Sequence, residues 1–453
     1  MTSETSAVPG FTGEAIRPGD AAYDAARRVF NGLIDKRPSM VLRCRTRADI
    51  VAAVRYGGQT GLQIAVRGGG HSVAGHSATD GGLLIDLSPM RAVVVDADAR
   101  TMAVEPGATW GDVDPVSARY GLACPGGVVS TTGVGGFALG GGIGWLSRSY
   151  GMTCDNLVGA ELVLPSGAVL SVDESRDAEV LWGLRGGGGN FGVVARFIFR
   201  LHPVSQIVGG VAGYGDGDAE AALRHFRARM DHADDHLAAI LDFSTDSASG
   251  RRLVHLMGCS TRTDRAGQDS VRALLAVDAA AGPPVMSVQH TMEYVAWQQL
   301  IDHTAPFGRL NYWKSVFVTE LSDEAIRRIA VLGRSLPSPQ SRLHLIRLGG
   351  AAGRVAQEAT AVADRHQPYI IHLMATWTDP ADTARCTAWA GQAYQILRPL
   401  GPGGAYLNFV GDEGRDRIRA SFGDTGYQRL ARLKARLDPD NLFRLNHNIE
   451  PAP

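Results

Sequence analysis

The sequence predicts an α+β fold, and two observations lead to this prediction. Up to about residue 203, short apolar segments alternate with glycine clusters, a pattern typical of strands joined by tight loops. From about 206 to 400 the glycine clusters thin out and longer strand-like and helix-like segments alternate, which favours an antiparallel sheet with helices on one face. A chain of 453 residues also favours two or more domains, since single cores stop growing near ~250–300 residues.

The first region opens with a helix and continues with strands. Residues 46–49 have the pattern of a capping box, an apolar helical face follows, and Gly61 can end the helix. Residues 62–66 predict a short buried strand that runs straight into a glycine loop. Further strands are expected at residues 83–87, 93–95, 102–105 and 193–199.

The second region contains longer elements. Apolar spacing predicts helices near residues 219–233, 322–332 and 381–397. Strand-like runs are found at residues 237–243, 253–257, 343–348 and 369–377. In the last segment, residues 430–449, the run from Asp438 to Phe443 predicts the end of a helix followed by an extended tail.

Composition excludes several classes of function. The formal net charge of −1 gives no global field that favours nucleic acid or an anionic membrane. Five scattered cysteines without CxxC spacing argue against a disulfide framework and against a metal site, and they favour a reducing compartment. The N-terminus shows no signal-peptide pattern, and no apolar stretch approaches the ~18 residues that a membrane span requires. We therefore expect a cytoplasmic protein; the sequence indicates no oligomeric state.

The run from Val66 to Ser72 is the most informative segment for function. Its consecutive glycines, Gly68, Gly69 and Gly70, leave the backbone N–H groups free to approach a ligand phosphate. His71 follows them directly, and a second imidazole, His76, lies close behind. The run therefore predicts a phosphate cradle with a nucleophilic ring nitrogen beside it.

Two further glycine clusters, residues 133–144 and 185–192, lie in the same region. Gly133, Gly135 and Ala138 fit a dinucleotide-binding fingerprint, but the preceding residues 125–132 have the composition of a loop and not of the required strand, so a Rossmann domain fits poorly. Each cluster taken alone is explained equally well by a tight turn or a bulge. Three clusters within one region favour an extended ligand with phosphates in its middle.

Five segments in order resemble the FAD-linked oxidases of the vanillyl-alcohol oxidase/p-cresol methylhydroxylase superfamily, in particular the berberine-bridge-enzyme-like branch. The segments are residues 67–72, 133–144, 185–192, 406–408 and 438–449. The resemblance implies an FAD-binding domain of the p-cresol methylhydroxylase type, formed by residues 1–205 and completed by residues 401–453. Residues 206–400 are then an inserted α+β substrate domain, whose antiparallel sheet covers the isoalloxazine.

The resemblance also implies which residues hold the cofactor. In the family, the histidine after the glycines bonds the flavin through its 8α-methyl group, and in this sequence that residue is His71; hydrogen bonding to a non-covalent flavin stays an alternative. The other cofactor-binding residues implied are Arg67, Gly68, Gly69, Gly70, Ser72, His76, Val129, Ser130, Thr132, Gly133, Gly135, Gly136, Gly140, Gly142, Val194, Tyr406, Asn408, Asn446 and Asn448.

Two positions depart from the family pattern. Members with two covalent links carry a cysteine four residues before the glycine that matches Gly133, and this chain has Val129 there, so we predict a single link. Many members have a tyrosine that serves as base where this chain has Phe409, which cannot accept a proton. His372 and Tyr406 are the candidates to replace it, although an imidazole on an apolar strand is as often a core residue.

The resemblance implies an FAD-dependent oxidase that takes a hydride from a small alcohol, amine or natural-product intermediate and reduces O₂ to hydrogen peroxide. With one histidyl link, the chain is most similar to bacterial members, some of them in secondary metabolism. Two alternatives remain open: an oxygenase working through an oxygenated flavin, and a flavin-containing binding protein without turnover. The expected partners are the small substrate and O₂, with no nucleic acid, no membrane and no metal.

Overall fold

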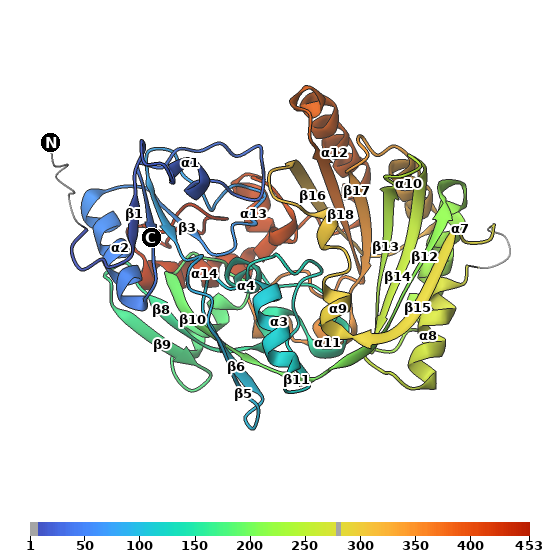
Figure 1. Ribbon diagram of the computed structural model, residues 1–453, viewed down its shortest axis with the longest axis horizontal. Helices are drawn as coiled ribbons and strands as arrows, with labels where there is room; N and C mark the ends of the chain where they lie inside the picture. The colour runs from blue at the N-terminus through green and yellow to red at the C-terminus, as the bar shows by residue number, and fades with distance from the viewer. Residues whose placement is uncertain (1–7, 278–281) are drawn as a thin grey trace.

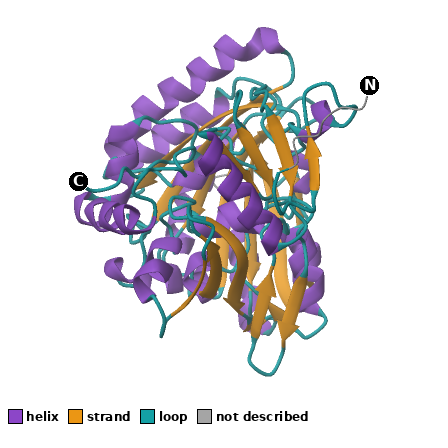
Figure 2. Cartoon of the chain, turned by 90° about the vertical axis from the view of Figure 1, so that its left-hand side faces the viewer, coloured by secondary structure: helices purple, strands orange, loops and turns teal. Residues whose placement is uncertain are grey.

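The computed structural model describes residues 8–277 and 282–453 and confirms the α+β class. Within these residues the strands form sheets of four, five, two and seven strands. The three smaller sheets occupy one side of the molecule and the seven-stranded sheet the other (Figure 1). Figure 2 views the molecule from the side of the smaller sheets, with most helices outside the strands.

The four-stranded sheet has the order β1-β2-β4-β3, formed by Glu14–Ile16, Met40–Arg43, Leu83–Asp86 and Ile64–Arg67. Helix α2 (Arg47–Thr60) confirms the predicted capping box, because the Thr46 side chain accepts a hydrogen bond from the Asp49 N–H. The helix ends at Gly61, whose φ of 67° is left-handed, as glycine allows. Strand β3 then leads directly into the first glycine loop.

The five-stranded sheet is antiparallel, with the order β5-β6-β10-β8-β9. Its strands are Val93–Asp96, Thr101–Val104, Val193–Arg200, Leu157–Val163 and Val169–Asp173. The second glycine cluster opens helix α4 (Val134–Leu139), and the strand before α4 is the two-residue β7 (Leu122–Ala123), which pairs antiparallel with β11 (His202–Pro203). The βαβ context of a Rossmann fingerprint is therefore missing around this cluster.

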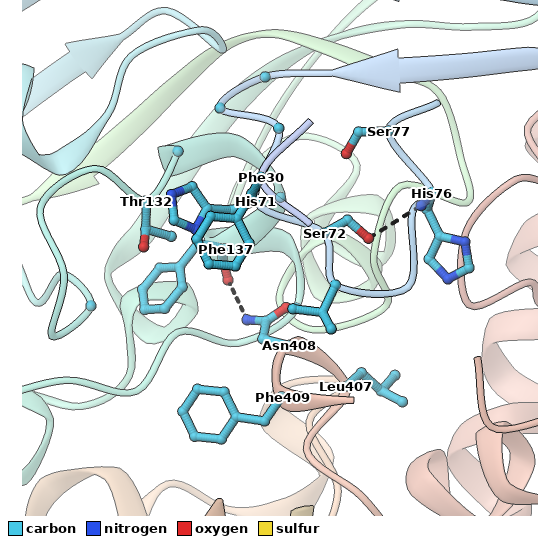
Figure 3. Close-up of a pocket in the computed structure, with 18 of the residues that line it drawn as sticks. Phe30, His71, Ser72, His76, Ser77, Thr132, Phe137, Leu407, Asn408 and Phe409 are labelled. Atoms are coloured by element: carbon cyan, nitrogen blue, oxygen red, sulfur yellow. Dashed lines mark hydrogen bonds between the residues drawn. The ribbon is translucent and has the colours of Figure 1, made fainter. Parts of the chain in front are cut away.

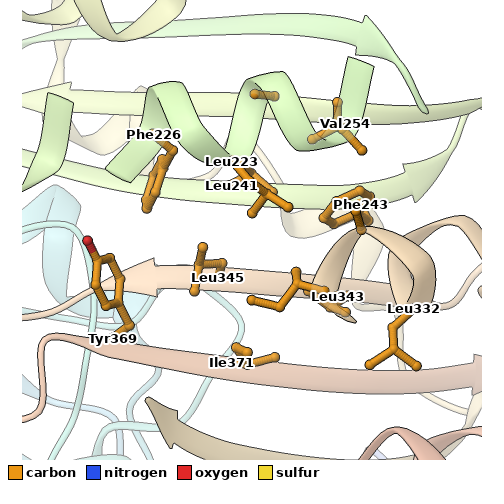
Figure 4. Close-up of a cluster of buried hydrophobic side chains, with 14 of the residues drawn as sticks. Leu223, Phe226, Leu241, Phe243, Val254, Leu332, Leu343, Leu345, Tyr369 and Ile371 are labelled. Atoms are coloured by element: carbon orange, nitrogen blue, oxygen red, sulfur yellow. The ribbon is translucent and has the colours of Figure 1, made fainter. Parts of the chain in front are cut away.

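The seven-stranded sheet is antiparallel throughout, with the order β15-β12-β14-β13-β17-β18-β16. In that order its strands are Met286–Glu293, Gln206–Gly215, Arg252–Ser260, Leu237–Thr245, Arg342–Arg347, Tyr369–Trp377 and Leu310–Val318. Helices pack on one face, as predicted; they are α7 (Ala219–Met230), α8 (Arg265–Leu275), α10 (Asp323–Arg334) and α12 (Thr383–Leu397). Figure 4 shows Phe226 of α7 and Leu332 of α10 against apolar side chains of this face.

The opposite face of this sheet packs on the first region. Ile240, Met257 and Ile370 of the sheet share one buried cluster with Trp145 and Tyr406. Strands β12, β15 and β16 were not predicted. For two of them the reason is their composition, because β12 is rich in glycine and β15 is an exposed, polar edge strand. Their pairing partners lie far away in the sequence.

The C-terminal segment returns to the first region. Helix α14 (Asp424–Leu437) contributes Leu430 and Leu433 to the apolar cluster beneath the five-stranded sheet, and Ile449 joins the same cluster. At the predicted helix end, Lys434 Nζ donates to Asp438 Oδ2 at 2.5 Å, and both side chains are completely buried. The shorter helices are Tyr23–Ala26, Trp110–Ala118, Ser147–Tyr150, Ala178–Leu184, Tyr294–Gln298, Gly350–Arg354 and Arg415–Phe422.

Among residues 8–277 and 282–453, no helix is both long enough and apolar enough to cross a membrane. In the same residues, no group of three or more histidine, cysteine or acidic side chains is arranged to hold a metal ion.

Asp114 gives the fold a testable pH dependence. Its carboxyl is 2% exposed in helix α3 (Trp110–Ala118), and neither oxygen has a hydrogen-bond partner among the described residues. Burial, with the charge of Asp302, raises the pKa of Asp114 well above its usual value. The folded state therefore holds a proton that the unfolded chain releases above pH ~4, so stability falls as pH rises, by at most ~1.4 kcal/mol per unit.

We expect Asp114→Asn to remove this slope, because the amide does not titrate. The difference in unfolding free energy between variant and wild type should grow in favour of the variant from pH 5 to pH 7, measured by urea unfolding of the flavin-loaded protein. Parallel stability curves for the two proteins would contradict the assignment.

Candidate functional site

A cavity of about 340 Å³ lies between the glycine loops and the open face of the seven-stranded sheet. All three glycine clusters line it, together with side chains from β16, β17 and β18 and residues 407–410 and 443–447 near the C-terminus. Figure 3 shows part of this lining, where the loop carrying His71 faces Asn408 and Phe409. Segments far apart in the sequence therefore meet at one site.

Arg67 braces the first glycine loop from behind. Its guanidinium makes two hydrogen bonds to Asp86, at 3.0 and 2.6 Å, and donates a third to the carbonyl of Arg28. Burial raises the pKa of Asp86, but the Arg67 guanidinium outweighs it and holds that pKa below its usual value. The pair is almost fully buried and does not line the cavity, so Arg67 positions the loop by fixing the end of β3.

His71 lies on the cavity wall in an aromatic environment. Its ring stacks on Phe30, with centroids 4.3 Å apart, and Phe307 meets it edge-on at 5.2 Å. Its Nε2 lies 3.2 Å from Thr131 Oγ1. Burial lowers the pKa of His71 to about 4, so the imidazole is neutral at pH 7 and one ring nitrogen keeps a free lone pair.

Close backbone contact explains the glycines of the first two clusters. A Cβ atom at Gly69 would lie 2.5 Å from the Cα of Gly133, and one at Gly68 would lie 2.6 Å from the carbonyl oxygen of Pro106. Gly70 has a φ of 71°, in the left-handed region. The two loops thus pack directly against each other and form one continuous, side-chain-free wall of the cavity.

Polar side chains tie the third cluster to the C-terminal segment. Asn190 donates to the carbonyls of Gly187 and His447, and it accepts from the Ile449 N–H at 3.0 Å. Asn446 donates to the carbonyl of Gly189 at 3.2 Å. The C-terminal segment thereby fixes the glycine loop that lines the cavity.

The structure gathers most of the predicted site residues at the cavity. Those that line it are Gly68, Gly69, Gly70, His71, Ser72, His76, Val129, Thr132, Gly133, Gly135, Gly136, Gly140, Val194, His372, Asn408 and Asn446. Five predicted residues do not line it: Arg67, Ser130, Gly142, Tyr406 and Asn448.

Tyr406 is held against backbone next to the cavity. Its hydroxyl oxygen accepts from the N–H groups of Gly142 and Ile143, at 2.7 and 3.1 Å, and Asn408 Nδ2 lies 3.0 Å from it. Burial raises the pKa of Tyr406 above its usual value, so the phenol is protonated at neutral pH. This geometry suits a residue that positions Asn408, whose Nδ2 also donates to the carbonyl of Phe137 (Figure 3).

Ser130 links the second glycine region to the segment before β16. Its N–H and hydroxyl both donate to the Asp302 carboxylate, at 2.7 and 2.5 Å. Val129, next to it, does line the cavity. Cys124 is fully buried, its pKa is raised well above the usual value by burial, and it does not line the cavity. None of the five cysteines, all within the described residues, reaches the cavity wall.

His372 projects from β18 into the cavity wall. Its ring stacks on Phe409, with centroids 4.0 Å apart and planes 1° from parallel, and Trp313 meets it edge-on at 4.9 Å. Its Nε2 has no hydrogen-bond partner among the described residues. Burial, with a contribution from His344, lowers the pKa of His372 well below its usual value, so the ring is a neutral proton acceptor.

A group of polar side chains on neighbouring strands was not predicted from the sequence. Arg342 and His344 of β17 line the cavity, and Asp242 of β13 lies behind them, 2.6 Å from Arg342 NH1 and 3.2 Å from His344 Nε2. Arg309 lines the cavity at the start of β16. The available signal was a charged residue inside an otherwise apolar strand, since burying an unpaired charge is costly. Trp313 of β16 lines the cavity as well.

The cavity fits an extended cofactor with phosphates and a ring system. The glycine wall is closed to side chains and offers backbone N–H groups. Four buried polar atoms of residues that line the cavity have no partner among the described residues: His76 Nε2, His372 Nε2, Asn446 Oδ1 and His447 Nδ1. A polar ligand would satisfy such atoms, which otherwise lose hydrogen bonds to water.

Comparisons with known proteins agree with this geometry. Residues 38–173 match a family described as the FAD binding domain, and residues 405–450 match one described as berberine and berberine like. An FAD-linked oxidoreductase of Dictyostelium discoideum is 30% identical over 97% of this chain and 95% of its own length. The (R)-6-hydroxynicotine oxidase of Paenarthrobacter nicotinovorans is 27% identical over 100% of this chain and 99% of its own.

Solved structures show the same fold. The crystal structure of the 6-hydroxy-D-nicotine oxidase from Arthrobacter nicotinovorans superposes with a TM-score of 0.90 at 24% identity, covering 99% of this chain and 100% of that chain. A berberine-bridge-enzyme-like protein of Physcomitrella patens superposes with a TM-score of 0.85 over 96% of both chains. The fold described above is thus shared by both of these chains over nearly their whole length.

Proposed function

Because the chain belongs to the berberine-bridge-enzyme-like branch of the FAD-linked oxidoreductases, we propose that it is an oxidase of a small organic molecule. One observation supports this most strongly: the same cavity is lined by the glycine wall, His71 and a neutral His372, whose Nε2 has no hydrogen-bond partner among the described residues. FAD bound there would accept a hydride from the substrate and pass the two electrons to O₂, giving hydrogen peroxide. The residues described below would bind and orient the flavin and the substrate, and would exchange protons with the substrate.

We propose that FAD lies against residues 1–205 and 401–453, and that residues 206–400 form the substrate unit. Support comes from the hydrogen bonds of Asn190 and Lys434, which join the third glycine cluster to the C-terminal segment. The cavity face of the seven-stranded sheet supplies the side chains opposite the glycine wall. The five cysteines are unpaired, which fits a reducing compartment.

We propose that His71 bonds the 8α-methyl carbon of the flavin and that this link is single. The methyl group would lose one C–H hydrogen and the imidazole its N–H proton as the C–N bond forms, and the two electrons released would pass through the flavin to O₂. A neutral imidazole is a competent nucleophile, and the ring is held by Phe30 and Phe307 in one orientation. Because Thr131 lies beside Nε2, Nδ1 is the ring nitrogen that is left to form this bond. Val129 stands on the wall where a second linking residue would be needed, and a valine cannot form that bond.

Gly69→Ala tests the glycine wall. The added methyl group would lie 2.5 Å from the Cα of Gly133, so the two loops must separate. We expect flavin binding to weaken by a factor on the order of tenfold or more, from an overpacking cost of ~1–3 kcal/mol. The measurement is the ratio of flavin to protein absorbance after purification. Gly391→Ala, where no atom lies within 4 Å of the added group, is the control and should retain full flavin content.

We propose that His372 takes the O–H or N–H proton of the substrate while the hydride leaves its carbon. Its neutral state and free Nε2 support this role. Phe409 fixes the ring by stacking and excludes water from that side. Tyr406 then has a positioning role, since its hydroxyl is occupied by the backbone of Gly142 and Ile143.

A screen for flavin reduction tests the oxidase proposal. Small alcohols, amines, sugars and polyketides are added to the holoprotein without oxygen, and the flavin absorbance is followed. An oxidase substrate bleaches the absorbance, and air restores it with one hydrogen peroxide formed per turnover. If no compound in any class bleaches the flavin, the reading as a binding protein without turnover gains support.

Isotope labelling separates an oxidase from an oxygenase. The reaction is run under ¹⁸O₂ with a substrate from the screen, and the organic product is analysed by mass spectrometry. Label found only in the hydrogen peroxide and water supports the oxidase. Label in the organic product would show that the flavin delivers oxygen to the substrate.

A further inference from the structure

The cavity has an unbalanced set of charges. Among the described residues that line it, none is an aspartate or a glutamate, whereas Arg309 and Arg342 both line it. They lie at the end of the cavity where β16 begins, close to Asn311 and Thr376, which form a hydrogen bond of 2.8 Å. The two arginines have different surroundings, and this difference indicates what the cavity binds.

Arg342 has its own counter-ion. Its NH1 lies 2.6 Å from Asp242 Oδ2, and the Asp242 side chain is 2% exposed. Burial raises the pKa of Asp242, but Arg342, with His255 and His344, outweighs burial and holds it well below its usual value. The carboxylate is therefore ionised, so it neutralises Arg342 and fixes the guanidinium at the cavity wall.

Arg309 has no counter-ion. Its NH1 donates one long hydrogen bond, of 3.4 Å, to the carbonyl of Thr304, and no carboxylate of the described residues lies within 4.0 Å of its side-chain nitrogens. Its main chain is held in place, because its carbonyl accepts from the Gly32 N–H at 2.8 Å and from Asn311 Nδ2 at 2.7 Å. Burial, and then the charge of Arg342, lower the pKa of Arg309, so the two guanidinium groups repel each other. An anion between them would remove this repulsion.

We propose that Arg309, with Arg342 beside it, binds an anionic group of the substrate, and that the substrate class is a small carboxylic acid or a molecule with an equivalent oxyanion. This inference deepens the proposed oxidase function and depends on it only for the identity of the molecule as a substrate. The planar guanidinium presents paired N–H donors that match a carboxylate.

The sheet register sets the length of such a substrate. His344 pairs with His372, and Arg342 pairs with Met374, so Arg342 and His372 are diagonal neighbours on the same face. Diagonal neighbours on paired strands lie ~7–8 Å apart. A carboxylate at the arginines therefore places a group about one aromatic ring away beside His372, where the proton is removed.

The test compares two probes of equal shape, benzoate and benzamide. In neither probe does the carbon that bears oxygen or nitrogen carry a hydrogen, so the proposed reaction has no hydride to remove. Isothermal titration calorimetry of the flavin-loaded protein measures both dissociation constants. We expect benzoate to bind at least 10-fold more tightly than benzamide. In Arg309→Gln, the dissociation constant of benzoate should rise by about 10- to 100-fold, as for loss of a charge-assisted hydrogen bond, while that of benzamide stays within about twofold.

Three controls accompany the test. Arg309→Lys keeps the charge and should retain a preference for benzoate, and Arg328→Gln, on the outer face of α10, should change neither constant. The affinity of the flavin for sulfite, which responds to charge near the ring, should be the same in Arg309→Gln as in wild type. A change in sulfite affinity without a change in benzoate binding would assign Arg309 to the flavin and overturn the proposal.

Three other outcomes also bear on the anion-site proposal or on the oxidase proposal. If the wild-type protein prefers benzoate to benzamide by less than 10-fold, the proposal is overturned without the use of any variant. A failure of Arg309→Gln to fold therefore does not leave the proposal untested. Equal weakening of benzoate and benzamide in Arg309→Gln would show a structural role and overturn it too. Benzoate selectivity in a protein whose flavin no screened compound bleaches would support a binding protein without turnover and leave the anion site intact, because binding is measured without turnover.

Discussion

In the His71→Ala variant, we expect the yellow colour to move from the acid-precipitated pellet to the supernatant. Acid unfolds the protein and releases a flavin that is held only by contacts, whereas a bond to the imidazole survives. The variant should also reduce its flavin more slowly, since the attached imidazole withdraws electrons and makes the flavin a stronger oxidant. The measurement is flavin absorbance in pellet and supernatant, with the intact mass of the wild-type protein as a second readout.

His76→Ala is the matched control, because His76 lies on the same loop, lines the same cavity and is also neutral, with its pKa lowered to about 3 mainly by burial. Its colour should stay in the pellet. Colour in the wild-type supernatant would show that no covalent bond forms. Loss of colour from the pellet in His76→Ala but not in His71→Ala would show that the flavin is bonded to His76 and would refute the role of His71.

Replacement of His372 by glutamine should lower the rate of anaerobic flavin reduction by about 10²- to 10⁴-fold, the usual contribution of a general base. Burial lowers the pKa of His372, so in wild type the ring stays unprotonated from neutral pH down to well below 6.5. The wild-type rate should therefore be independent of this group above pH 6.5 and fall only in more acid solution. Stopped-flow measurement across this range, with a substrate from the screen, tests both points.

His344→Gln is the control for the base, because His344 faces His372 across the paired strands β17 and β18 with ring centroids 6.4 Å apart. We expect it to lower the rate by less than about tenfold, since a neighbour that only shapes the cavity contributes little to proton transfer. A larger loss in His344→Gln than in His372→Gln would make His344 the base and refute the role of His372. Flavin content is measured in both variants to separate catalysis from folding.

Those parts of the fold that depend on residues close together in the sequence were predictable. The capping box at Thr46, the glycine stop at Gly61 and the strand before the first glycine loop all depend on residues close together in the sequence. Three of the helices that cover the seven-stranded sheet, α7, α10 and α12, were predicted for the same reason, since apolar spacing reveals their buried faces, whereas α8 was not predicted. Strands β12 and β15 were missed, because a glycine-rich or polar strand is stabilised by its partners and not by its own composition.

In the site, too, the parts that lie in continuous runs of residues were predicted, whereas the directions of individual side chains were not. The glycine loops and His71 were recognised because their chemistry lies in a continuous run of residues. Arg67 and Tyr406 were assigned to the site from their place in such runs, but both side chains face neighbouring protein groups and not the cavity. A position in a motif places the backbone near the ligand, whereas the direction of the side chain depends on what packs around it.

The family, the α+β class and the loop that carries His71 could be predicted from the amino-acid sequence alone, because each depends on residues that are contiguous in the chain. The tertiary structure was needed to show that Arg342 and His372 line one cavity and that Asp242 lies next to Arg342. These residues come from β13, β17 and β18, and the strand register places them on one face. Arg342 has a buried counter-ion, whereas no carboxylate of the described residues lies within 4.0 Å of the side-chain nitrogens of Arg309. Charge compensation depends on distances between segments far apart in the chain, and no local pattern records those distances.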